Sequence, residues 1–278
     1  MKLADGSLRN GVVAQSTGNH GQGLALAAKL VSVERGFHIP AYIVLPEIAT
    51  SSKIDATRDY GGEVYFSGYT LPERQKKAYE VQKNTGATMI APFGNCDVML
   101  GQGTAIYEFK RQMEEEGLGS LASVIVPCGS GSLLTGTAIA CKNTSTRVFG
   151  AEPSEGGADD VVRGLKLGKR IGSVQSLTIA DGLRSPVGES NWEIIKRREY
   201  VEGVFSATEE HIKSAMKLVL EWAGVLIEPS AALPLAILLY NREFQNVYID
   251  GMSASEENIG IILSGGNTTV EKIKEIWK

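Results

Sequence analysis

Short apolar runs rich in β-branched residues alternate along the chain with longer segments whose apolar residues recur at helical spacing. The first pattern predicts buried strands and the second predicts helices. The predicted strands cover residues 11–14, 41–46, 63–66, 88–90, 123–127, 147–152 and 258–263. The predicted helices cover residues 23–30, 51–60, 72–85, 105–116, 137–142, 160–165, 191–198, 208–223 and 230–240, with a last short helix at the C-terminus. This alternation is typical of an α/β fold with mostly parallel sheets and helices on both faces.

Residues 154–187 depart from the pattern. They are irregular and rich in glycine, which predicts a long loop around the short helix at 160–165. Long loops in compact α/β domains are usually functional. The composition marks no domain boundary, and Pro92–Asn95 is the best candidate for one.

The composition indicates a globular protein that acts on a small molecule. The chain has 278 residues, of which 43% are hydrophobic, enough for a sizeable core. Its 28 Lys and Arg residues nearly balance its 32 Asp and Glu residues, and both kinds occur in short mixed runs. The sequence therefore predicts no positively charged surface that could bind nucleic acid. The N-terminus is too polar for a signal peptide, and no apolar run approaches the ~20 residues of a membrane helix. We therefore expect a cytoplasmic protein that binds neither nucleic acid nor a membrane.

The three cysteines do not indicate a disulfide-bonded or zinc-binding protein. Cys96, Cys128 and Cys141 form no CxxC pair, and no histidine lies near them at the spacing of a metal site. Neither a disulfide scaffold nor a zinc site is predicted.

A glycine-rich turn follows the strand that ends at residue 127 and opens a helix. Backbone N–H groups and the helix dipole then converge on an anion, so the turn favours a phosphate group. The turn also imitates a dinucleotide fingerprint, since Gly129 and Gly131 are followed about 20 positions later by Glu152. That fingerprint needs a third glycine where Leu134 stands. A plain tight connection is the remaining alternative.

Two further turns end strands. Ser16–Gln22 offers hydroxyls, amides and backbone N–H groups without net charge, which suits a carboxylate better than a metal. His20 taken alone is more often a packed, hydrogen-bonded histidine than a catalytic one. Ser264–Asn267 taken alone could be a simple left-handed turn. Ligands of parallel α/β sheets lie beyond the carboxyl ends of the strands, where all three turns are expected.

The order and spacing of Ser16–Gln22, Gly129–Leu133 and Ser264–Asn267 resemble those of the fold-type II pyridoxal-phosphate (PLP) enzymes. Within that group the chain resembles the serine racemase and serine/threonine dehydratase family, and looks like a fungal-type member that is truncated at the N-terminus. Five other segments match this subfamily: residues 41–46, 101–104, 151–154, 179–182 and 227–231. The resemblance covers essentially the whole chain.

The resemblance implies a tryptophan synthase β-like PLP fold of two three-layer αβα domains with mostly parallel sheets. Residues 1–96 would form the small substrate-binding domain. Residues 97–278 would form the large PLP-binding domain, without its N-terminal part. The family also implies a homodimer when the protein is full length.

The resemblance assigns roles to residues in the three turns. The residues implied to hold the cofactor phosphate are Gly129, Ser130, Gly131, Ser132 and Leu133. Ser264 would bond the pyridine nitrogen and leave it unprotonated, which favours elimination. Asn19 would contact the ring hydroxyl. The residues implied to hold the substrate carboxylate are Ser16, Thr17, Gly18, Asn19 and His20.

The family's divalent cation site looks like Glu152, the carbonyl of Ala158 and Asp160, whose hard oxygen ligands suit Mg²⁺ or Ca²⁺. Glu155–Gly157 makes this loop two residues longer than in the animal racemase, so the ligand register is open. A solvated acidic loop is an equal alternative. Lys53 and Tyr60 would line a nucleotide effector site by the same resemblance, or be ordinary surface residues.

Two positions favour deamination of serine or threonine to a 2-oxo acid and ammonia over racemisation. Thr17 stands where serine racemase uses a serine as its acid/base, and its methyl group restricts the rotamers. Phe93 looks like the dehydratase version of a position that is asparagine in the animal racemase. Racemisation of serine would be a side or alternative activity.

PLP lyases need a lysine that holds the cofactor as a Schiff base and moves the α-proton. Lys2 is the only lysine before Thr17, and the surrounding family motif is absent there. Two explanations are open: a shortened product or gene model of an active dehydratase, or a non-catalytic relative. The rival of another class, a nicotinamide-dependent oxidoreductase, predicts no use for Ser264–Asn267.

Overall fold

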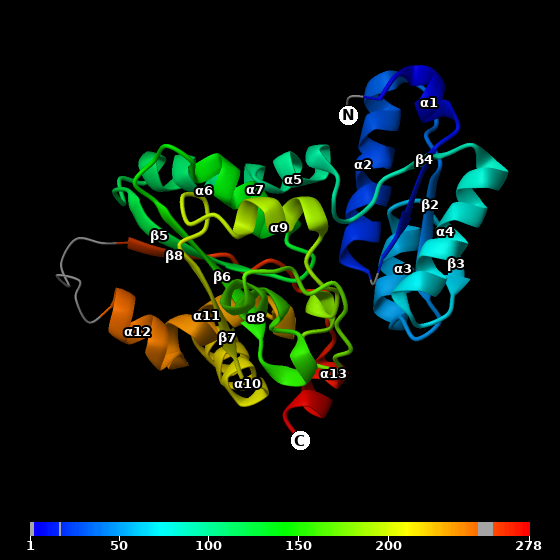
Figure 1. Ribbon diagram of the computed structural model, residues 1–278. Helices are drawn as coiled ribbons and strands as arrows, with labels where there is room; N and C mark the ends of the chain where they lie inside the picture. The colour runs from blue at the N-terminus through cyan, green and yellow to red at the C-terminus, as the bar shows by residue number, and fades with distance from the viewer. Residues whose placement is uncertain (1–2, 17, 250–257) are drawn as a thin grey trace. The chain divides into compact units, whose positions relative to one another are not determined.

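The computed structural model describes residues 3–16, 18–249 and 258–278 (Figure 1). The chain divides into two compact units, Met1–Pro92 and Phe93–Lys278, and the division lies at the start of the Pro92–Asn95 segment. Each unit has its own sheet and its own core.

The first unit is built on a four-stranded parallel sheet in the order β3-β2-β1-β4. Its strands are β1 (Val12–Gln15), β2 (Ala41–Pro46), β3 (Gly62–Ser67) and β4 (Thr88–Met89). Its helices are α1 (Asp5–Arg9), α2 (Asn19–Arg35), α3 (Ser51–Asp59) and α4 (Leu71–Thr85).

Alternate residues of β1 and β2 face opposite sides of this sheet, as the period of two in a strand requires. Val12 and Ala14 pack with side chains of α1 and α2, whereas Val13 packs with side chains of α4. The unit therefore has three layers, with helices on both faces of the sheet. In α4, Thr70 and Glu73 form a capping box that fixes the start of the helix.

The second unit contains a four-stranded parallel sheet in the order β7-β6-β5-β8. Its strands are β5 (Leu121–Pro127), β6 (Arg147–Pro153), β7 (Gly203–Ala207) and β8 (Asn258–Ile261). Its α-helices are α5 (Cys96–Gln102), α6 (Thr104–Glu115), α7 (Ser132–Cys141), α8 (Asp160–Leu167), α9 (Glu189–Ile195), α10 (Glu209–Leu218), α11 (Pro229–Tyr240), α12 (Arg242–Tyr248) and α13 (Val270–Ile276). The short 3₁₀ helices η1 (Glu155–Gly157) and η2 (Asp181–Leu183) and the π-helix η3 (Val219–Ala223) complete it.

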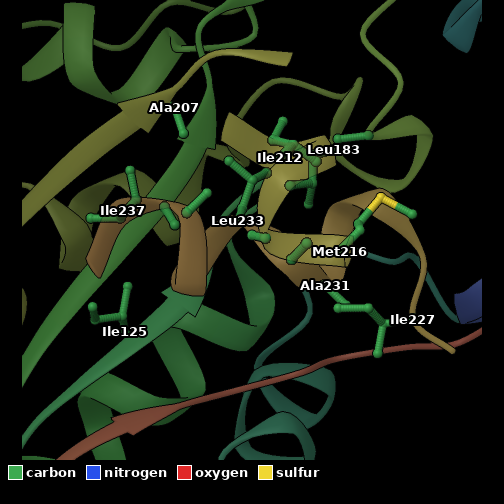
Figure 2. Close-up of a cluster of buried hydrophobic side chains, with 14 of the residues drawn as sticks. Ile125, Leu183, Ala207, Ile212, Met216, Ile227, Ala231, Leu233 and Ile237 are labelled. Atoms are coloured by element: carbon green, nitrogen blue, oxygen red, sulfur yellow. The ribbon is translucent and has the colours of Figure 1, made fainter. Parts of the chain in front are cut away.

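Helices cover both faces of this sheet as well (Figure 1). Ile125 of β5 points to the face covered by α10, α11 and α12, and Figure 2 shows it below Leu233 and Ile237 of α11. Its neighbours Val124 and Val126 face the side covered by α6, α7 and α9. The predicted fold class, two three-layer αβα units with parallel sheets, is confirmed.

The structure corrects several predicted elements. Helices α1, α5 and α12 and strand β7 have no counterpart among the predicted elements. The helix predicted to start at residue 137 starts at Ser132, so part of the presumed phosphate turn is already helical. None of the helices in the described part of the chain combines the length and the apolar composition that crossing a bilayer requires.

Candidate active site

Three neighbouring strands of the second unit deliver the predicted site residues to one edge of the sheet. Ile125 of β5 pairs with Ile261 of β8, and Pro127 of β5 pairs with Ala151 of β6. The Gly129 turn, Ser264 and Glu152 therefore follow or end adjacent parallel strands at their carboxyl ends, where ligands of such sheets bind.

The Gly129 turn, residues 128–131, leads directly into the first turn of α7. Gly131 has a φ of +92°, and a Cβ there would lie 3.0–3.1 Å from Val187, Asn191 and Ile195. A Cβ at Gly129 would lie 2.9 Å from the Cα of Leu183. Both positions therefore require glycine, for backbone conformation and for close approach.

Hydrogen bonds hold both ends of this turn. The Gly188 N–H donates to the Ser130 carbonyl at 3.0 Å, and the Thr135 N–H donates to the Gly131 carbonyl at 2.8 Å. The N–H groups of a first helical turn lack intrahelical acceptors. Those at the start of α7 can therefore receive an anion. Ser132 is buried, whereas Ser130 and Leu133 are half-buried.

Ser264 lies beyond β8 and is exposed, so its hydroxyl is accessible at this edge. The turn that carries it is fixed by the Glu228 N–H, which donates to the Gly265 carbonyl at 3.1 Å. A Cβ at Gly266 would lie 2.9 Å from the Leu226 carbonyl oxygen, so this turn also packs tightly.

In the first unit, the turn between β1 and α2 is organised by Ser16. Its buried Oγ accepts the N–H groups of Gly18 at 3.0 Å and of Gly21 at 2.9 Å. Gly18 has a φ of +142°, and a Cβ there would lie 2.5 Å from Cδ of Lys53. Thr17, the predicted acid/base residue, lies outside the described residues.

Lys53 packs against this turn and is 3% exposed. The alternative that Lys53 is a surface residue is therefore wrong. Tyr60, its proposed companion in an effector site, is 36% exposed.

Asn19 and His20 begin α2, a 17-residue helix whose N-terminus favours an anion. His20 Nε2 bonds the Ile90 carbonyl at 3.0 Å, and because a carbonyl can only accept, this nitrogen carries the proton. Burial lowers the pKa of His20, although the bond to Ile90 opposes this effect. The ring is therefore neutral near pH 7, and it offers a carboxylate no positive charge.

The neutral state of His20 predicts a pH effect on stability. In the unfolded chain His20 binds a proton at the ordinary histidine pKa of about 6.5. In the folded chain its pKa is lower, so the proton binds only at a lower pH. The free energy of unfolding should therefore fall as the pH drops below about 6.5, by at most one proton's slope. In His20→Gln this slope should be shallower in urea titrations between about pH 7 and 5. His38→Gln is the control, because that side chain is exposed, and an unchanged slope in His20→Gln would contradict the prediction.

Glu152 and Asp160 are both buried next to the N-terminus of α8. Glu152 Oε1 and Oε2 accept the N–H groups of Val161 and Val162 at 3.1 and 2.9 Å. Asp160 Oδ2 accepts the Val187 N–H at 3.0 Å, while Oδ1 is buried with no hydrogen-bond partner among the described residues. Burial first, and the charge of Asp160 second, raise the pKa of Glu152 well above its ordinary value.

The loop extension Glu155–Gly157 forms a 3₁₀ turn, and an arginine bonds its last residue. Arg163 donates to the Gly157 carbonyl at 2.6 Å and to Asp159 Oδ1 at 2.8 Å. Arg163 therefore pairs with Asp159, whereas Asp160 Oδ1 has no hydrogen-bond partner among the described residues. Arg163 was not among the residues predicted from the sequence, although a position four residues after Asp159 at the start of a helix is typical of an ion pair.

The described residues contain no group of three or more His, Cys, Asp or Glu side chains able to hold a metal ion. Glu152 and Asp160 are two carboxylates, so a cation there would need the predicted third ligand to be a backbone carbonyl. Ala158, which would provide it, is 1% exposed.

Comparisons with known proteins find similar sequences and similar structures. A family model described as "Pyridoxal-phosphate dependent enzyme" matches residues 1–265. The chain is 39% identical over 269 residues to a serine racemase of Oryza sativa subsp. indica, covering 95% of this chain and 73% of that protein. The structure of maize serine racemase matches with a TM-score of 0.85 at 37% identity, covering 98% of this chain and 78% of the other. The processed form of threonine deaminase isoform 2 from Solanum lycopersicum matches with a TM-score of 0.83 at 32% identity, covering 99% and 71%. The family model favours PLP over a nicotinamide dinucleotide.

Proposed function

This chain belongs to the family of pyridoxal-phosphate dependent enzymes, and on that premise we propose that, joined to a segment that supplies the Schiff-base lysine, it deaminates serine or threonine to a 2-oxo acid and ammonia. Racemisation of serine is the second activity that we propose. The matched relatives include serine racemases and a threonine deaminase, which supports this pair of reactions.

The observation that carries the proposal is the Gly129 turn at the start of α7, with Ser264 at the same sheet edge. The turn fits a phosphate ester, because its glycines allow close approach and the helix N-terminus supplies N–H donors. Gly129–Leu133 would hold the phosphate of PLP and Ser264 its pyridine nitrogen. When bound, PLP supplies the electron sink for bond cleavage at the substrate α-carbon.

We assign recognition of the substrate carboxylate to residues 16–20 in the first unit. The N-terminus of α2 attracts the negative charge, and the Ser16 bonds to Gly18 and Gly21 preorganise the turn. In this assignment Asn19 also contacts the cofactor ring and Thr17 moves a proton. We assign substrate binding to the first unit and PLP binding to the second; their division after Pro92 lies four residues before the boundary predicted at residue 96.

We propose a Mg²⁺ or Ca²⁺ ion at Glu152, Asp160 and the Ala158 carbonyl. The fit rests on the unpaired, buried Oδ1 of Asp160 and on an all-oxygen donor set, which both ions prefer. A nucleotide effector near Lys53 and Tyr60 and a homodimer are proposed from the family resemblance alone, and a cytoplasmic location is proposed from the sequence composition.

Ligand titration followed by intrinsic fluorescence tests the proposal. The chain should bind PLP at least about tenfold more tightly than pyridoxal, which lacks the phosphate, and should bind NADH weakly. Gly131→Val should lose most of this preference, because its Cβ would meet Val187, Asn191 and Ile195. A tenfold loss corresponds to about 1.4 kcal/mol.

Gly168→Val is the matched control for Gly131→Val. Gly168 also has a positive φ, +67°, but a Cβ there would meet nothing within 4 Å. Gly168→Val therefore also places a side chain at a positive φ, but without disturbing the Gly129 turn. Equal binding of PLP and pyridoxal by the unsubstituted chain, or tighter binding of NADH, would refute the proposed function.

A further inference from the structure

We propose that Asn191 is a positioning residue for the cofactor phosphate, through a buried brace formed by Gly188, Asn191 and Thr135. The brace holds the Gly129 turn and the first turn of α7 in register with each other. This inference rests on the proposed function, since it concerns the same phosphate site.

Asn191 joins segments that are far apart in the sequence. Its side chain on α9 is fully buried, at 0% exposure. Oδ1 accepts the Gly94 N–H at 3.2 Å, and Nδ2 donates to Thr135 Oγ1 at 3.2 Å. One amide therefore ties the start of the second unit to α7.

Thr135 is the point at which the brace reaches the anion site. It is also fully buried, and its N–H makes the 2.8 Å bond to the Gly131 carbonyl that closes the first turn of α7. A bond from Asn191 to the Thr135 hydroxyl therefore fixes the rotation of the turn whose N–H groups would bind a phosphate.

Gly188 holds the other side of the same site. Its N–H donates to the Ser130 carbonyl at 3.0 Å, and its own carbonyl accepts the Trp192 N–H at 2.9 Å. A Cβ at Gly188 would lie 2.5 Å from Asn191 Oδ1, so the backbone here packs directly on the amide. Residues at the start of α9 therefore position both parts of the phosphate site: Gly188 bonds the Gly129 turn, and Asn191 bonds the first turns of α7.

The brace lies within apolar surroundings formed by Val187, Trp192 and Ile195. In such surroundings no water replaces a lost hydrogen-bond partner. The bond between the Asn191 amide and the Thr135 hydroxyl therefore strongly restricts the positions of both groups. Small displacements matter here, because binding groups must be held within about 0.5 Å of their working positions.

The test compares two isosteric substitutions on α7. Thr135→Val removes the hydroxyl that Asn191 contacts. Thr137→Val is the matched control, because Thr137 is also 0% exposed and its Oγ1 has no hydrogen-bond partner in the described part of the chain. In the full chain, Thr135→Val should weaken PLP binding about tenfold and change pyridoxal binding less than about twofold. Thr137→Val should change neither.

Two further variants separate positioning from stability. Thr135→Ser keeps the hydroxyl and should restore PLP affinity to within about twofold. Asn191→Leu should weaken PLP binding about as much as Thr135→Val does. The double variant Thr135→Val/Asn191→Leu should bind PLP little more weakly than either single variant, because both residues act through one bond.

The outcomes are distinct. Equal weakening of PLP and pyridoxal in Thr135→Val and Asn191→Leu, or no weakening of PLP, would overturn the positioning role. Failure of the unsubstituted chain to prefer PLP over pyridoxal would instead count against the proposed function. Should Asn191→Leu not fold, the Val and Ser variants at position 135 still decide the matter.

Discussion

Residues 1–278 expressed by themselves are expected to release no ammonia from L-serine or L-threonine. The same residues preceded by the lysine-bearing segment of a serine racemase should release it. The reason is chemical, because the lysine both attaches the cofactor and moves the α-proton. A positioned acid–base group alone contributes about 10²–10⁴-fold to a rate, so the difference between the two proteins should be at least that large. Ammonia is measured by a coupled assay in the presence of PLP.

The matched control is the extended protein with that single lysine changed to alanine. It should be as inactive as residues 1–278, and borohydride treatment followed by mass spectrometry should show covalent PLP in the active form only. Release of ammonia by residues 1–278 at the rate of the extended protein would contradict the prediction. Lys2 or Lys29 would then be the first lysines to examine.

Adding millimolar Mg²⁺ or Ca²⁺ to chelator-treated protein is expected to raise its free energy of unfolding by up to about 3 kcal/mol at neutral pH. Burial raises the pKa of Asp160 from 3.8 to about 6 in the metal-free fold. Keeping this carboxylate ionised above that pKa therefore costs about 3 kcal/mol, at 1.36 kcal/mol per unit, which a bound cation can offset.

The pH dependence of this effect follows from the sign of the shift. A raised pKa means that the folded state holds a proton which the unfolded state has released, so metal-free stability declines as the pH rises from about 4 to about 6. The cation competes with that proton. Stabilisation by Mg²⁺ should therefore be smaller at about pH 5 than at about pH 7.5.

Asp160→Asn and its neighbour Asp159→Asn form the matched pair for this prediction. Asp160→Asn removes the buried charge, so the variant should lose the response to Mg²⁺. Asp159 bonds Arg163 instead, and its variant should keep the response. Thermal unfolding with and without the chelator measures both, and equal responses in the two variants would contradict the assigned site.

Much of the fold could be predicted because strands such as β5 are continuous apolar runs. Strand β7 was missed because Gly203–Ala207 has only two large apolar residues, Val204 and Phe205. Its extended form depends on pairing with β6, which no local pattern reveals. The start of α7 was misplaced because Gly136 suggested a turn. In the structure that glycine lies inside the helix, where a Cβ would come within 2.2 Å of the Met99 carbonyl oxygen.

The site was predictable to the extent that its chemistry is carried by contiguous motifs. Gly129–Leu133, Ser264 and Glu152 lie at one sheet edge, as the strand pattern indicates. Asn191 could not be found in this way, because its partners Gly94 and Thr135 lie 97 and 56 residues away along the chain. Contacts of this kind exist only once the sheet and its helices have formed.

The division of the chain into Met1–Pro92 and Phe93–Lys278 has a consequence for how such a protein can diversify. Ser16 directly follows a strand of one sheet, and the Gly129 turn follows a strand of the other. Because each unit has its own hydrophobic core, substitutions that reshape the first turn leave the core beneath the Gly129 turn in place. Under the roles proposed above, the preference for an amino-acid substrate can therefore change while the cofactor site is retained.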